Sequence, residues 1–297
     1  MKTFNDFQRS FLMFVSLAIV FSFMLFLGGC GGGGGDVGTT KQATGVFLDS
    51  PVSGLEYITD DLGGVTDTDG SFFYNGGSAV EFYVGDIYLG AATGVKIMTP
   101  VSLSNGAEDE TDPIVTNICR FLQTLDDDGN ATNGIQITQM VRDFAAGMDI
   151  NFNQSVSEFE SGSLLQQTIR DLTHQTAAGE RTLVSASQAR EHMRNTLIAL
   201  YSGSYQGTFS GGDTGTWEIV VNSAGYINGS LFSNEDSTYY SVNGTIDSSG
   251  DFGMVAGTTT SGATFRGTTD FLTGNISGTW VNSYWGISGS FSGSRGN

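Results

Sequence analysis

The chain has 297 residues, of which 43 are glycine, 3 proline and 2 cysteine, and its formal net charge is −19. A surface this acidic repels nucleic acid and anionic lipid headgroups, which argues against nucleic acid as a partner. The length is enough for two or three domains.

The N-terminal segment predicts export. Residues 11–27 carry no charge, follow Lys2 and Arg9, and end in small residues before Cys30. A basic start, an apolar stretch and small residues before the cut are typical of a secretory signal peptide. An uncleaved membrane span is the alternative, although the stretch lies at the short end of the roughly 17–25 residues that cross a bilayer.

The cysteine at the end of this segment resembles the lipobox cysteine of bacterial lipoproteins. The resemblance implies that residues 1–29 form a cleaved lipoprotein signal peptide and that Cys30 carries the lipid that anchors the chain to a membrane. Gly31 implies delivery to the outer membrane, because lipoproteins retained in the inner membrane have Asp at that position. Whether the protein faces the periplasm or the cell exterior is left open. Residues 30–43 are rich in glycine and predict a flexible tether.

Residues 44–107 predict a β-sandwich. Apolar and aromatic residues alternate with polar ones in short runs, and turn-forming residues such as Asp67–Gly70 separate the runs. The stretch resembles the carboxypeptidase regulatory-like, transthyretin-like β-sandwich repeat in residues 45–46, 50–54 and 66–72. In that pattern an Asp-Gly turn brings Phe72 into the core. The first turn lacks the Gly-Lys-Pro of the family, which leaves the strand register open.

Residues 108–202 predict an α-helical segment of four or five helices. Asp112 before Pro113 is typical of an N-cap followed by the first helical position, and apolar residues then recur at helical spacing. Capping-box spacings predict further helix starts, at Ser155, Ser163 and Ser185.

An acidic turn after the first of these helices is the best candidate for a metal site. Asp126, Asp128 and Asn130 present oxygen ligands at alternate positions, like the first half of a calcium loop, but the twelfth position is Ile137 and not Glu. The alternative is a helix end followed by a turn, although three carboxylates at the negative end of a helix dipole are unfavourable without a counter-ion. Calcium is the one cofactor that the sequence indicates.

Residues 203–297 predict an antiparallel meander of eight strands. A motif of four residues recurs here: an apolar or aromatic residue, any residue, glycine, and then Ser or Thr. Successive copies are 22, 15, 23, 11 and 11 residues apart, which indicates a unit of about eleven residues, the length of a strand and a turn. The repeats centre on Gly207, Gly229, Gly244, Gly267, Gly278 and Gly289. Two further strands fill the longer gaps, around Ile219 and Met254.

The repeated glycines favour closure of this meander into a barrel. In each repeat the glycine lies on the same face as the apolar residues, where glycine is destabilising unless the sheet curves sharply. Closure also removes two exposed edges. A membrane-spanning barrel is disfavoured, because the alternate positions are largely Ser, Thr, Asn and Gln. The segment resembles the eight-stranded barrels of transferrin-binding-protein-type surface lipoproteins, and the resemblance implies no ligand residue.

The fold class is therefore predicted as multidomain α+β: an N-terminal β-sandwich, an α-helical middle and a C-terminal antiparallel eight-stranded β-barrel. Enzyme motifs are missing from the sequence, so we expect a non-catalytic protein. A buried Cys119 thiol is favoured over a nucleophile, since neither histidine lies in a recognisable catalytic motif.

We expect an outer-membrane lipoprotein that binds an unknown protein or glycan ligand. Aromatic side chains of the barrel are the candidate contact surface, because aromatics supply rigid recognition area. They are Trp217, Tyr239, Tyr240, Tyr284 and Trp285. An envelope polysaccharide- or peptidoglycan-acting hydrolase and a structural envelope protein are the alternatives.

Overall fold

The computed structural model describes residues 42–258 and 260–296. The predicted signal peptide, Cys30 and the glycine tether lie outside the described residues. Within that described part, no helix combines the length and the apolar character of a membrane span.

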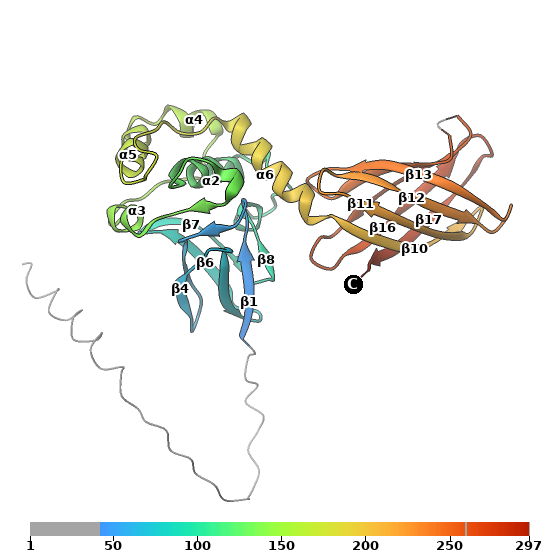
Figure 1. Ribbon diagram of the computed structural model, residues 1–297, viewed down its shortest axis with the longest axis horizontal. Helices are drawn as coiled ribbons and strands as arrows, with labels where there is room; N and C mark the ends of the chain where they lie inside the picture. The colour runs from blue at the N-terminus through green and yellow to red at the C-terminus, as the bar shows by residue number, and fades with distance from the viewer. Residues whose placement is uncertain (1–41, 259, 297) are drawn as a thin grey trace, which may run out of the picture. The chain divides into compact units, whose positions relative to one another are not determined.

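Two small β-sheets open the described chain (Figure 1). In the first, β1 (Gln42–Phe47) lies between β5 (Ser71–Asn75), which is antiparallel to it, and β8 (Ile97–Met98), which is parallel. The second is antiparallel, in the order β4–β3–β6–β7. Its strands are β3 (Glu56–Ile58), β4 (Gly63–Val65), β6 (Ala79–Val84) and β7 (Ile87–Thr93).

Aromatic side chains from both sheets meet in the core. The rings of Phe47 and Phe72 lie 4.6 Å and 5.2 Å from the ring of Phe82, measured between centroids. Phe72 enters the core from the predicted turn, in which Oδ1 of Asp67 accepts hydrogen bonds from the N–H groups of Asp69 and Ser71. The predicted turn and its effect on Phe72 are confirmed.

Five α-helices follow in residues 113–200. They are α2 (Pro113–Leu125), α3 (Gln139–Phe144), α4 (Val156–Ser161), α5 (Ser163–Thr173) and α6 (Ala186–Leu200). Asp112 caps α2, Ser155 forms a capping box with Glu158, and Ser185 caps α6, as predicted. The predicted cap at Ser163 is wrong, because this residue is already helical and Gly162 precedes it without a side-chain cap.

One hydrophobic core joins the sheets to the helices. It contains Phe47 and Phe82 from the strands together with Phe121 of α2 and Ile169 of α5. The parallel strands β2 (Val52–Ser53) and β9 (Ile135–Gln136) connect the two regions by hydrogen bonds, and β9 follows the acidic turn after α2. This pairing brings the acidic turn next to the first strands of the chain.

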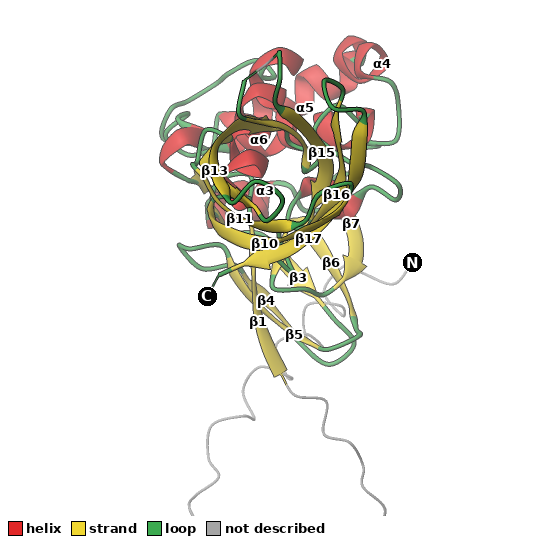
Figure 2. Cartoon of the chain, turned by 90° about the vertical axis from the view of Figure 1, so that its right-hand side faces the viewer, coloured by secondary structure: helices red, strands yellow, loops and turns green. Residues whose placement is uncertain are grey.

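The last eight strands form a closed antiparallel barrel, in which each strand pairs with the next and β17 pairs with β10 (Figure 2). Its strands are β10 (Gly203–Gly211), β11 (Gly215–Val221), β12 (Tyr226–Ser233), β13 (Thr238–Ile246), β14 (Asp251–Ala256), β15 (Ala263–Thr269), β16 (Asn275–Asn282) and β17 (Ile287–Arg295). The predicted fold class is confirmed, with N-terminal sheets, a helical middle and this barrel.

The repeated glycines let large side chains fill the barrel. Tyr205 and Phe209 point inward on either side of Gly207, and a Cβ at Gly207 would lie 2.1 Å from the Ser292 carbonyl oxygen and 2.4 Å from the Trp217 indole. No side chain larger than hydrogen fits there without movement of the neighbours. Glycine at this position therefore admits the tryptophan to the core.

Candidate functional site

The end of the barrel at which β10 and β12 finish contains a cavity of about 520 Å³. The described residues of four hairpin loops surround this opening, which we call the barrel mouth: residues 212–214, 234–237, 257–258 with 260–262, and 283–286. An antiparallel meander brings alternate loops to the same end, so residues far apart in sequence meet here.

The floor of the mouth cavity is aromatic. Phe209 and Phe265 pack against Trp280, with ring centroids 5.8 Å and 6.1 Å away, and all three side chains are buried. Leu231 and Ala256 complete the apolar surface. The floor therefore offers an apolar, aromatic surface to any ligand in the mouth cavity.

The rim of the mouth cavity is acidic. Asp213, Glu235 and Asp236 line it, and no Lys, Arg or His is among the described lining residues. The hydroxyl of Tyr240 donates a hydrogen bond to Asp236, which holds the pKa of that carboxyl below its ordinary value. Asp236 is therefore a carboxylate at neutral pH.

The other end of the barrel is filled by protein. Tyr201 belongs to the barrel core, its ring lies 5.7 Å from that of Phe271, and its hydroxyl donates to the Ser248 carbonyl oxygen at 3.5 Å. Tyr205 follows it inward and donates to the carbonyl oxygen of Tyr201. The cavity is therefore a blind pocket and not a channel through the barrel.

The five aromatic residues predicted as a contact surface do not form one surface. Tyr240 and Trp285 line the mouth cavity, and the exposed Tyr284 contacts Trp285 edge-on with 5.0 Å between ring centroids. Tyr239 is exposed on the outside of the barrel, against Phe232. Trp217 is only 3% exposed and packs in the core. The mouth thus brings together three of the five.

Sequence reasoning did not find the acidic rim. Asp213, Glu235 and Asp236 lie in hairpin loops, where acidic residues commonly bind backbone N–H groups, as Asp213 does with Thr214. The sequence does place these three acids in loops at the same end of the barrel. Recognising that pattern requires the number and direction of the strands to be known first.

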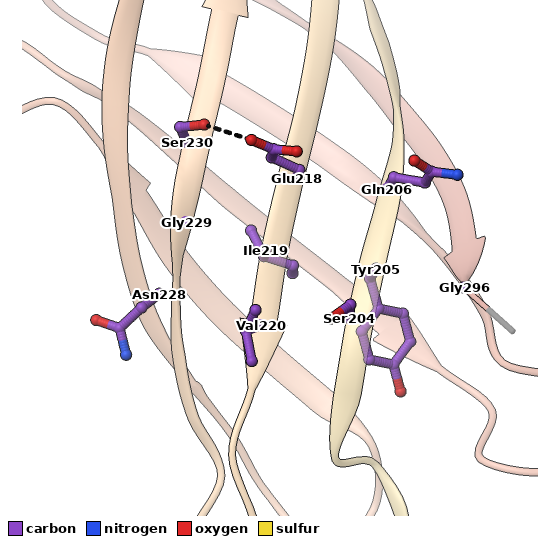
Figure 3. Close-up of a pocket in the computed structure, with 10 residues that line it drawn as sticks. All are labelled: Ser204, Tyr205, Gln206, Glu218, Ile219, Val220, Asn228, Gly229, Ser230 and Gly296. Carbon is purple, nitrogen blue, oxygen red and sulfur yellow. Dashed lines mark hydrogen bonds between the residues drawn. The ribbon is translucent and has the colours of Figure 1, made fainter.

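A smaller groove of about 320 Å³ runs over the outer face of β10, β11 and β12 (Figure 3). Small and polar residues line most of it, and Glu218 is its one charged side chain among the described residues, with an oxygen 3.5 Å from the Ser230 hydroxyl. Gly229 packs closely against Ile219, because a Cβ at this glycine would lie 2.6 Å from the Ile219 Cα. The groove has neither the aromatic floor nor the concentrated charge of the mouth.

The acidic turn after α2 forms a separate polar cavity of about 210 Å³. Asp126 and Asp128 line it, whereas the Asn130 side-chain oxygen accepts a hydrogen bond from the Thr132 hydroxyl. Asn133 lines the cavity and donates to Asp128 at 2.9 Å. Burial raises the pKa of Asp126, and the hydrogen bond from Asn133 lowers the pKa of Asp128.

A buried cluster around Asp49 has some features of a catalytic triad without its geometry. The Ser50 hydroxyl lies 3.0 Å from Nε2 of His192, but the Asp49 carboxylate lies 3.7 Å from the same nitrogen. In a triad the acid and the serine bind opposite nitrogens of the ring. Cys119, beside Asp49, is fully buried and burial raises the pKa of its thiol, which makes it a poor nucleophile.

Within the described residues, no group of three His, Cys, Asp or Glu side chains is placed to hold a metal ion. Any ion at the acidic turn would therefore bind two carboxylates together with neutral oxygens.

No protein-family model matches the chain, and no curated protein matches its sequence.

Proposed function

We propose that this protein is a non-catalytic binding module, anchored to the outer membrane by lipid on Cys30, whose barrel mouth takes a small ligand with an apolar body and a cationic group. The observation that carries the proposal is the mouth cavity, about 520 Å³ in volume, with an aromatic floor and three carboxylates on its rim. Pockets of roughly 300–1,000 Å³ hold small organic ligands. The anchor and its membrane are inferred from the sequence alone.

The floor favours the apolar part of such a ligand. Trp280 and Phe265 present ring surface at the bottom of the cavity, and Trp285 adds an exposed indole at its edge. Aromatic faces bury apolar surface and also attract cations that lie over them, by about 0.5–2 kcal/mol each.

The rim favours a positively charged ligand over a negatively charged or a neutral one. Asp213, Glu235 and Asp236 act without a basic neighbour among the described lining residues, in a concave site where the potential is concentrated. Anions are repelled from such a mouth. A neutral ligand would gain from the floor but not from the carboxylates.

Tryptophan fluorescence tests this assignment, because the chain has only 3 tryptophans and two of them line the cavity. The full chain in phosphatidylcholine vesicles would be titrated with 4-phenylbutylammonium and with the neutral 4-phenylbutanol. We expect the ammonium compound to bind at least about tenfold more tightly, a difference of ~1.4 kcal/mol. Asp236→Asn should weaken ammonium binding severalfold, because it removes the carboxylate that Tyr240 orients.

Asp251→Asn is the matched control, since Asp251 is an exposed acid at the other end of the barrel and does not line the cavity. It should leave both affinities unchanged. Equal affinity for the ammonium and the alcohol would contradict the cationic ligand. Lack of binding by both would favour the purely structural alternative.

A further inference from the structure

The acidic turn after α2 supports a second site, independent of the barrel. Asp126 is the C-cap residue of α2 and is 1% exposed. Its Oδ1 accepts a hydrogen bond from the Gln136 N–H at 2.9 Å. Its Oδ2 is buried, and no described residue donates a hydrogen bond to it. A buried carboxylate oxygen without a partner is costly, and a bound cation would offset that cost.

The unpartnered oxygen belongs to a side chain that lines a polar cavity. Asp128 lines the same cavity, and its two oxygens accept hydrogen bonds from the Asn130 N–H at 2.8 Å and the Asn133 amide at 2.9 Å. Thr68, from the turn before β5, brings a further oxygen-bearing side chain to the cavity from a distant part of the sequence. The lining residues thus include carboxylate, amide and hydroxyl side chains.

The net charge of the groups around the cavity would be balanced by one divalent cation. Asp126, Asp127 and Asp128 are consecutive, and Asp127 is held outside the cavity by the Ala177 N–H, which donates to its Oδ1 at 2.9 Å. Arg181 does not line the cavity, and its Nη2 donates to the Asp126 carbonyl oxygen at 2.5 Å. One guanidinium offsets one of three carboxylates, and two negative charges remain.

We propose that the cavity lined by Asp126, Asp128, Asn133 and Thr68 binds a calcium ion. Calcium takes six to eight oxygen ligands in flexible geometry and accepts water among them, which suits two carboxylates with neutral oxygens. The set differs from the loop expected from sequence spacing, because Asn133 and Thr68 take part in place of Asn130. With two charged ligands, we expect a dissociation constant of about 0.1–1 mM, the range of extracellular calcium modules.

The bound ion would join three segments that are far apart in sequence. The turn before β5, the end of α2 and the residues before β9 all line the cavity. Calcium would therefore stabilise the packing of the sheets against the helical region, and the thermal transition of that region should respond to it.

Calorimetric titration of the chelator-treated full chain with CaCl₂, together with thermal unfolding, tests the proposal. We expect one calcium per chain and a rise in Tm of about 2–4 °C at millimolar calcium. Magnesium at the same concentration should give a smaller rise, because it requires stricter octahedral geometry. Absence of calcium binding at about 10 mM, well above the expected dissociation constant, or a larger effect of magnesium, would overturn the assignment.

Four variants distinguish binding at this site from diffuse electrostatic attraction of calcium to an acidic chain. Asp128→Asn, at an exposed position where folding is not at risk, and Asn133→Ala should each weaken calcium binding at least severalfold. Asp127→Asn, one residue away but outside the cavity, is the matched charge control and should bind as the natural chain does. Asn130→Ala should also bind normally. Equal losses in Asp127→Asn and Asp128→Asn would indicate diffuse electrostatic attraction and contradict the site.

Discussion

Asp49 is a fully buried carboxyl group, and opposing effects of its surroundings set its pKa. Burial raises its pKa from 3.8 to about 6, even though His192, Gln123 and Cys119 each lower it. The amide of Gln123 donates to Oδ2 at 2.9 Å, and Nε2 of His192 lies 3.7 Å from Oδ1. The desolvation of the charged form therefore outweighs the polar contacts.

This balance makes the free energy of unfolding depend on pH. The folded chain holds the Asp49 proton more tightly than the unfolded chain, so stability falls as pH rises from about 4 to 6 and stays lower above that window. Asp49→Asn keeps the size and the acceptor for Gln123 but removes the charge. We expect the variant to be more stable than the natural chain at pH 7.5, by up to ~3 kcal/mol, and of equal stability at pH 4.

Urea unfolding at both pH values measures the difference. Asp69→Asn, at an exposed turn position, serves as the control and should show no such dependence on pH. A loss of stability in Asp49→Asn at pH 7.5 would mean that the charged carboxylate is the favoured form in the folded chain, which is the opposite of the expected direction.

At the scale of single elements, features that depend on neighbouring residues could be predicted from the sequence, whereas features that depend on packing could not. Asp112 and Ser155 could be assigned as helix caps from sequence, because a cap depends only on the next three residues. The start of α5 could not, because Gly162 and Ser163 are both acceptable there and the preceding helix α4 decides where the chain turns. The glycine period of the barrel was a long-range signal that the sequence did carry.

The inward glycines should be the positions in the strands least tolerant of substitution. A Cβ at Gly207 would overlap the Ser292 carbonyl and the Trp217 indole, whereas a Cβ at Gly253 of β14 would meet no atom within 4 Å. Gly207→Ala should destabilise the barrel by about 1–3 kcal/mol through overpacking. Gly253→Ala should change stability by less than ~1 kcal/mol, in the stabilising direction, because alanine restricts the unfolded chain.

Tryptophan fluorescence during urea unfolding reports these changes directly, because Trp217, Trp280 and Trp285 all lie in residues 203–297. A Gly253→Ala variant as unstable as Gly207→Ala would show that strand flexibility, and not the approach of Trp217, requires glycine.

At the scale of the whole molecule, the described chain has separate hydrophobic cores. The core of the barrel consists of residues between Tyr201 and Phe291, and the core of the sheets and helices consists of residues before Val184. A third, smaller cluster joins α2 to α6. Because each region buries its own apolar surface, each has its own source of stability.

The barrel should therefore fold when it is produced without the preceding residues. We expect a fragment of residues 200–297, which keeps Tyr201 as the filling of the closed end, to unfold cooperatively in urea with tryptophan fluorescence as the probe. A broad transition without a cooperative midpoint would show that the barrel depends on the residues before it. The same fragment should keep the ligand preference of the mouth and lose calcium binding.

The sequence by itself determined the parts of this protein that depend on periodic or local patterns. The barrel with its strand number and inward glycines, the turn that brings Phe72 inside and the acidic turn after α2 all follow from residues that are neighbours or regular repeats. Only the tertiary structure decided which loops share the barrel mouth, and that Thr68 and Asn133 meet Asp126. Those arrangements depend on how strands close and on how α2 packs against the sheets, and contacts between distant residues leave no regular spacing in a single sequence.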